Sequence, residues 1–180
     1  MFPAFRKIKN KMFFRFVEDA ILPAFVILAV KSVTMIIYIV IYNLNFYIQD
    51  NSIQLTSFND FLMANDYSNI ITFLVVLSFS LWLLVKGFLF HNTHISPKLS
   101  SWLHNNELSF LIMGSYELYL KLIVWTIFLW FITLIISIHY FLGITSSWVF
   151  YSSVFFTILT TVLTMVDVER DYHLFRLSKY

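Results

Sequence analysis

Four apolar runs, each long enough to cross a lipid bilayer, constrain this chain more than any other feature of its sequence. The runs cover residues 21–47, 69–90, 118–142 and 148–166. A helix rises 1.5 Å per residue, so about 20 residues cross about 30 Å of hydrocarbon. Core helices of soluble proteins carry a polar face and are not uniformly apolar four times in succession. The sequence therefore predicts an all-α, polytopic integral membrane protein with four transmembrane helices.

The composition of the chain agrees with this class. Hydrophobic residues make up 59% of the 180 residues and charged residues 12%, whereas soluble domains have roughly half and a quarter. A soluble domain of this size keeps much of its surface in water and could not cover so much apolar area. The chain has no cysteine, which excludes disulfides, thiolate metal sites and cysteine nucleophiles.

A basic segment, residues 1–19, precedes the first run, and residues 20–180 form the predicted transmembrane domain. The segment contains five cationic residues: Arg6, Lys7, Lys9, Lys11 and Arg15. Its apolar residues recur at helical spacing, which predicts an amphipathic helix in the membrane interface. A second interpretation, equally open, is a positively charged flank that only fixes orientation.

The distribution of positive charge predicts the topology. The two loops at residues 49–68 and 143–147 contain no Lys or Arg. Lys and Arg concentrate in the cytoplasmic loops of membrane proteins. We therefore expect both termini on the cytoplasmic side and these two loops on the opposite side.

The loops differ in character. In residues 91–117, Ser96 and Pro97 are typical of a helix start, and the segment predicts a helical hairpin on the membrane surface. Residues 143–147 form a short turn, which requires the third and fourth helices to be antiparallel neighbours.

Hydroxyl side chains predict how the last two helices pack. The chain has three glycines, and spans two to four contain no alanine, so small residues cannot provide the close packing usual in membranes. Hydroxyls recur at helical spacing instead: Ser153, Thr157, Thr160 and Thr164 in the fourth run, and Thr126, Thr133, Ser137 and Tyr140 in the third. We expect these two stripes to face each other or a partner, although such hydroxyls can also bond to their own backbone.

Lys31 is the most unusual polar residue because it lies inside the first apolar run, where a charge is costly. One interpretation is a polar track shared with Tyr38, or a buried ion pair with Glu117 or Asp167. The other, which we favour, is that the span begins near Lys31 and the amine reaches the inner surface.

Histidines are the remaining candidates. His139 lies near the outer end of the third run, and we interpret it as an interfacial side chain bonded to water. His91 and His94 have a spacing that allows a shared metal ion, but the segment resembles a turn. We therefore expect no metal site and no cofactor.

These observations favour a non-catalytic function. The sequence has no phosphate-binding loop, no metalloprotease or serine-hydrolase motif and no central acidic residue in any span. Our first hypothesis is an accessory membrane subunit that scaffolds, assembles or anchors a larger complex, with the bilayer and other membrane subunits or itself as partners, and no nucleic acid. The alternative is a small homo-oligomeric channel or transporter in which Lys31 and the hydroxyl-lined faces line the path.

Overall fold

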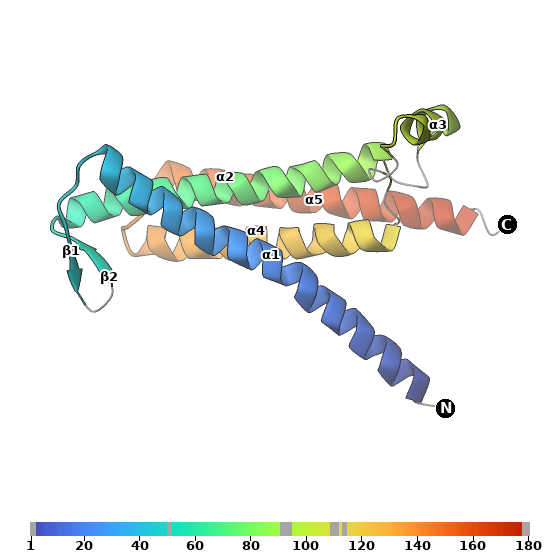
Figure 1. Ribbon diagram of the computed structural model, residues 1–180, viewed down its shortest axis with the longest axis horizontal. Helices are drawn as coiled ribbons and strands as arrows, with labels where there is room; N and C mark the ends of the chain where they lie inside the picture. Colours follow the sequence, from blue (N-terminus) through green and yellow to red (C-terminus); the bar gives the residue numbers. More distant parts are fainter. Residues whose placement is uncertain (1–2, 50–51, 91–94, 109–111, 113–114, 178–180) are drawn as a thin grey trace. The chain divides into compact units, whose positions relative to one another are not determined.

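The computed structural model describes residues 3–49, 52–90, 95–108, 112 and 115–177, and the side chains of residues 16–47, 55–89, 95–108, 112 and 117–170. Within this part of the chain, five helices and one hairpin follow in order (Figure 1): α1 (Pro3–Ile41), β1 (Phe46–Gln49), β2 (Ser52–Leu55), α2 (Phe58–Phe90), α3 (Pro97–Asn105), α4 (Ser115–Phe141) and α5 (Ser147–Leu177).

Four of the described helices are long and apolar enough to cross a membrane. The candidate spans are Phe16–Ile41, Phe58–Leu89, Glu117–Phe141 and Ser147–Arg170. This confirms the predicted number of apolar helices, and the protein has the helical content and hydropathy of a multi-pass membrane protein.

The helices contribute to two compact units, which we describe separately. The first unit comprises Met1–Ala20, Ser78–Ile127 and Ile158–Tyr180, and the second comprises Ile21–Leu77 and Phe128–Thr157. The buried apolar side chains of the first unit include Leu83, Leu103, Leu118, Leu122 and Trp125. Those of the second include Ile27, Ile39, Phe73, Val76, Leu129, Ile132 and Ile136.

The helix α1 is longer at its start and shorter at its end than the sequence predicted. It runs unbroken from Pro3 to Ile41, with Pro23 inside it, so the basic segment and the first span form one helix. The boundary predicted at residue 19 therefore lies inside a continuous helix. The side chains of Arg6, Lys7, Lys9, Lys11 and Arg15 lie outside the described ones, and their placement in a membrane interface stays a prediction.

The end of α1 is set by Asn43. The backbone N–H groups of Asn43 and Leu44 donate to the carbonyls of Val40 and Ile39, at 3.3 and 3.0 Å, and Asn43 has a φ of 50°. This is a Schellman motif, for which Asn is the commonest residue after Gly because its short polar side chain tolerates the left-handed conformation. The helix therefore stops at Ile41, although the apolar run continues to residue 47.

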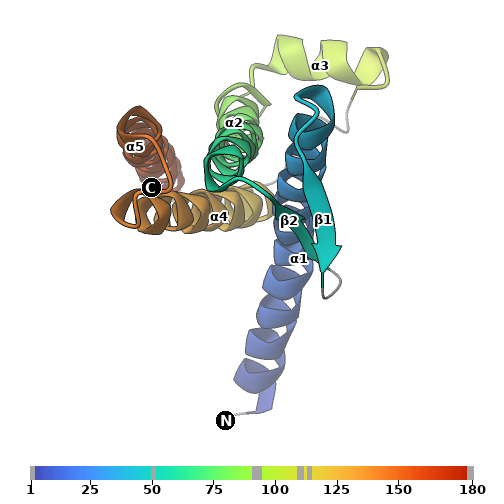
Figure 2. The ribbon, with the colours of Figure 1, turned by 90° about the vertical axis from the view of Figure 1, so that its left-hand side faces the viewer.

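The apolar residues beyond α1 form a β-hairpin, which the all-α expectation did not include. The strands β1 and β2 are antiparallel, with Phe46 opposite Leu55 and Gln49 opposite Ser52. Figure 2 shows them side by side between the end of α1 and the start of α2. The backbone N–H and the hydroxyl of Thr56 both donate to the carbonyl of Asn45, at 3.1 and 3.0 Å, and close the base of the hairpin.

The helix α2 begins at Phe58, whereas the predicted span begins at residue 69. Ser57 accepts the first helical bond, from the N–H of Phe61 at 3.1 Å, and Asp60 lies in the first turn, where its charge favours the helix dipole. Hydropathy predicted only the apolar part of this helix, because the first turns contain the polar residues Asn and Asp.

Two local predictions are confirmed. The Ser96 side chain caps α3 by accepting a bond from the N–H of Leu99, and Pro97 occupies the first turn. Gly143, with a φ of 72°, ends α4 in a second Schellman motif, and α5 begins at Ser147. Of the hairpin expected over residues 91–117, the described part contains the short helix α3, and residues 91–94, 109–111 and 113–114 lie outside that part.

Candidate functional site

A cluster of polar side chains in the second unit joins three helices. Lys31 of α1 donates from Nζ to Oδ1 of Asn69 in α2, at 2.7 Å. The Nδ2 atom of Asn69 lies 3.1 Å from Nδ1 of His139 in α4. The Nδ2 atom of Asn65, one turn earlier in α2, lies 3.4 Å from the same nitrogen. We refer to Lys31, Asn65, Asn69 and His139 as the polar cluster.

The donors and acceptors of the cluster fix its hydrogen-bonding pattern. A lysine ammonium group can only donate, so the amide oxygen of Asn69 must face Lys31. The amide nitrogen of Asn69 then faces His139 and donates to Nδ1. His139 is consequently neutral, with its hydrogen on Nε2. The side chain of Asn69 thus accepts a hydrogen bond from α1 and donates one to α4.

The face of α2 that carries this cluster is polar and buried. Ser68, Asn69 and Thr72 follow Asn65 by three, four and seven residues, and each of the four is at most 5% exposed. Ser68 and Thr72 donate to backbone carbonyls of their own helix at 2.9 and 2.7 Å. Buried polar groups are costly unless they are paired, and in hydrocarbon every such group must find a partner within the protein. The pairing of Asn69 with both Lys31 and His139 meets this requirement.

Lys31 has an amide partner in place of the carboxylate that we considered. Among the described residues, no carboxylate lies within ion-pair distance of its Nζ atom. Glu117 is paired with Lys121 in α4, at 2.9 Å, as their spacing predicts. Asp167, the other carboxylate considered, is buried in the first unit, where its Oδ2 lies 3.1 Å from the position that a Cβ would take on Gly87.

Tyr38 adds an aromatic contact between the same two helices. Its ring lies 4.4 Å from that of Tyr42 in α1 and 5.1 Å from that of Tyr67 in α2, measured between centroids. Tyr38 and Lys31 are seven residues apart and so share one face of α1. The contacts of this face with α2 therefore include one charged hydrogen bond and one aromatic pair.

The hydroxyl stripes are buried and one pair connects the two helices. In the second unit, Oγ1 of Thr133 in α4 and Oγ1 of Thr157 in α5 are 2.7 Å apart. The Thr133 hydroxyl also lies within hydrogen-bond distance of the carbonyl of Leu129, to which it donates at 2.8 Å. Ser137 and Ser153 bond to carbonyls of their own helices.

Two members of the stripes in the first unit bond within their helices. Thr126 donates to the carbonyl of Leu122, and Thr164 to that of Thr160, both at 2.8 Å. Bonds to the own backbone and a contact between helices thus occur together, since Thr133 makes both.

The histidine candidates for a metal site receive no support within the described residues. No group of three or more His, Asp or Glu side chains there could hold a metal ion. His91 and His94 lie outside the described residues, and His104 is exposed on α3. His139 is bonded to two amides, whereas we had expected water as its partner.

Sequence reasoning missed Asn65 and Asn69, which contribute most to the cluster. Residues 49–68 were interpreted as a loop and Asn69 as the first residue of a span, so their common face was not considered. The helical spacing of the polar residues at positions 65, 68, 69 and 72 could have predicted this face.

Comparison with models of known protein families, with curated proteins and with solved structures finds no match. The function must therefore be argued from the chain itself.

Replacing Asn69 with Leu removes the acceptor for Lys31 and the donor for His139. We expect Asn69→Leu to lower the free energy of unfolding in detergent by about 1–3 kcal/mol, because it leaves buried polar groups unpaired. The matched control is Asn59→Leu, an exposed Asn in the same helix, for which we expect a change within about 0.5 kcal/mol. Equal effects of the two substitutions would contradict the role assigned to the cluster.

Proposed function

We propose that this chain is a non-catalytic integral membrane subunit that anchors or assembles a larger membrane complex, and that α1 is the helix that contacts the partner. The observation that carries this proposal is the exposure of α1. Only 11% of its most apolar stretch is buried, compared with 39%, 44% and 28% in the candidate spans of α2, α4 and α5.

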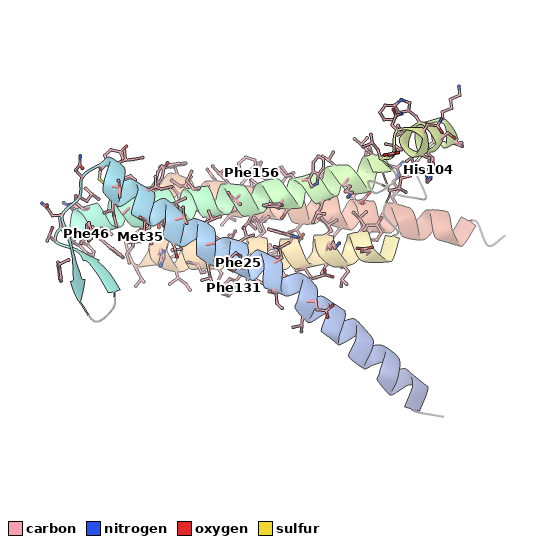
Figure 3. The ribbon with its side chains drawn as sticks, in the orientation of Figure 1. Phe25, Met35, Phe46, His104, Phe131 and Phe156 are labelled. Carbon is pink, nitrogen blue, oxygen red and sulfur yellow. The ribbon has the colours of Figure 1, made fainter. Side chains whose placement is uncertain are left out.

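The exposed side chains of α1 are large and numerous. Phe25 and Leu28 are 67% and 69% exposed, and Figure 3 labels Phe25 on α1. Ile36, Ile37, Val40 and Ile41 follow them along the helix and are also exposed. Because transmembrane helices associate by close packing, a bulky apolar face with few contacts to its own chain suits a neighbouring subunit.

The hydrogen bonds within the polar cluster also support a non-catalytic role. The cluster consists of an ammonium group, two amides and a neutral imidazole, and their hydrogen bonds are directed at one another. None of these is a hydroxyl or carboxylate nucleophile activated by a neighbouring base.

The mass and composition of the particle extracted by gentle detergent from the native membrane test this proposal. We expect other subunits to co-purify with the chain in a fixed ratio. We expect Phe25→Ala combined with Leu28→Ala to reduce the amount of co-purified partner, because the change removes contact area from α1.

The control for this experiment is a pair of the same residue types elsewhere. Phe155→Ala combined with Leu159→Ala alters exposed side chains of α5 and should leave the ratio unchanged. A particle that contains only this chain would refute the proposal, and equal losses from both pairs would refute the assignment to α1.

A second candidate function, a small homo-oligomeric channel or transporter, is favoured by one specific observation. The ammonium group of Lys31 is partly buried and has no carboxylate partner among the described residues, while Asn69 and His139 continue the polar contacts to α4. An uncompensated positive charge inside a span attracts an anion.

Chloride flux through vesicles that contain the full chain tests this candidate. Lys31→Leu should abolish the flux while the oligomer stays intact. Lys86→Leu, at another lysine within a candidate span, serves as the control and should retain the flux. Vesicles of the unaltered protein that pass no more chloride than protein-free vesicles would rule the candidate out.

We further propose that both termini lie on the cytoplasmic side, with the basic segment at the membrane surface. The support is the absence of Lys and Arg from residues 49–68 and 143–147. Because the chain has no cysteine, single introduced cysteines report the topology without interference.

A membrane-impermeant maleimide applied to intact cells should label Ser147→Cys, in the loop without positive charge. It should label Ser101→Cys, in α3, only after the membrane is permeabilised. Both serines are exposed, so their accessibility depends on the side of the membrane. The opposite labelling pattern would place the termini outside.

A further inference from the structure

An apolar groove lies between α2 and α5 within the first unit. Its volume is about 470 Å³, and its apolar walls include Leu84, Val85 and Phe88 from α2 and Leu163 and Val166 from α5. The two helices contribute residues 81–89 and 163–170, so the groove extends over about 10–12 Å at 1.5 Å per residue. This volume lies in the range of pockets that bind small molecules, about 300–1,000 Å³.

One end of the groove carries a positive charge. Arg170 lines the groove, and its guanidinium carbon lies 5.1 Å from the centroid of the Phe88 ring. A guanidinium group over an aromatic ring makes a cation–π contact, which holds the side chain in place without neutralising it. Arg170 is exposed and makes no ion pair among the described residues.

A carboxylate, Asp167, also lines this end of the groove but is largely buried. Asp167 is 6% exposed, and its Oδ2 lies 3.1 Å from the position that a Cβ would take on Gly87, where the Leu118 side chain lies equally close. The absence of a side chain on Gly87 leaves room for this carboxylate. The carboxylate of Asp167 is therefore largely buried, while the guanidinium group of Arg170 remains accessible.

The charged end of the groove coincides with the ends of two candidate spans. The span of α2 ends at Leu89 and that of α5 at Arg170. In a bilayer this level is the boundary between hydrocarbon and headgroups, where arginine attracts anionic lipids. The apolar part of the groove then extends from this boundary into the hydrocarbon.

We propose that this groove is a binding site for an anionic phospholipid, with one acyl chain between α2 and α5 and the phosphate on Arg170. The dimensions support an acyl chain over a partner helix, because a helix with its side chains is about 10–12 Å across and a groove of this volume does not contain it. The charge supports a phosphate, which a guanidinium group can bind through two parallel hydrogen bonds. This site is independent of the function proposed for α1.

Native mass spectrometry of the purified full chain tests the site. The protein is freed of lipid in detergent and mixed with equal amounts of phosphatidylglycerol and phosphatidylcholine of the same chain length. We expect one phosphatidylglycerol to be retained in preference to phosphatidylcholine. Arg170→Gln should reduce this preference about fivefold, the typical contribution of one arginine near an anionic lipid.

Three further variants distinguish the site from general effects. Lys86→Gln removes a positive charge of α2 that does not line the groove and should leave the preference unchanged. Val166→Trp, at an exposed position, fills the groove and should reduce retention of both lipids, whereas Leu159→Trp, exposed elsewhere on α5, should not.

Three outcomes would overturn the proposal. The first is equal retention of the two lipids by the unaltered protein. The second is an equal effect of Arg170→Gln and Lys86→Gln on the preference. The third is a second copy of the chain that binds in place of lipid and is displaced by Val166→Trp.

Discussion

The amide group of Asn69 is the point on which the arrangement of the second unit depends. Lys31 can only donate to it, and His139 in its neutral form accepts from it, so the amide has one permitted orientation between α1 and α4. In hydrocarbon, apolar side chains gain little by exchanging lipid for protein, so their packing alone does not select one rotation of α1. A polar contact does select one rotation of α1, because turning the helix by one residue would move Lys31 about 100° away from its acceptor.

This arrangement also explains how one helix can be fixed and still expose most of its surface. The described contacts of α1 with α2 include one charged hydrogen bond, at Lys31, and one aromatic pair, at Tyr38. A hydrogen bond to a charged group contributes about 1.5–3 kcal/mol, comparable with the burial of one large apolar side chain. Elsewhere on α1, Phe25 and Leu28 stay exposed. A partner subunit or lipid can therefore contact these side chains without any rearrangement of the polar cluster.

The sequence predicted the helical fold better than the ends of the helices. Long apolar runs must be helical in lipid, since no other single segment satisfies its own backbone there. The end of α1 depends instead on the left-handed backbone conformation of Asn43, which cannot be predicted from hydropathy. The start of α2 at Phe58 was missed for the converse reason, since polar residues such as Asn65 belong to the helix. The polar cluster was missed because of the same error: Asn65 was assigned to a loop and Asn69 to the start of a span, so their common face was not considered.

The hydrogen bonds of Asn69 have different sequence separations, and this has a consequence for biogenesis. Its acceptor atom pairs with Lys31, which precedes it by 38 residues, whereas its donor atom pairs with His139, which follows it by 70 residues. At a synthesis rate of about 5–20 residues per second, the ribosome needs roughly 4–14 s to reach His139 after Asn69. When the helices enter the bilayer in chain order, α1 and α2 can pair at once, but the amide nitrogen of Asn69 has no imidazole partner during this interval. Water or the insertion machinery must shelter that group until α4 arrives.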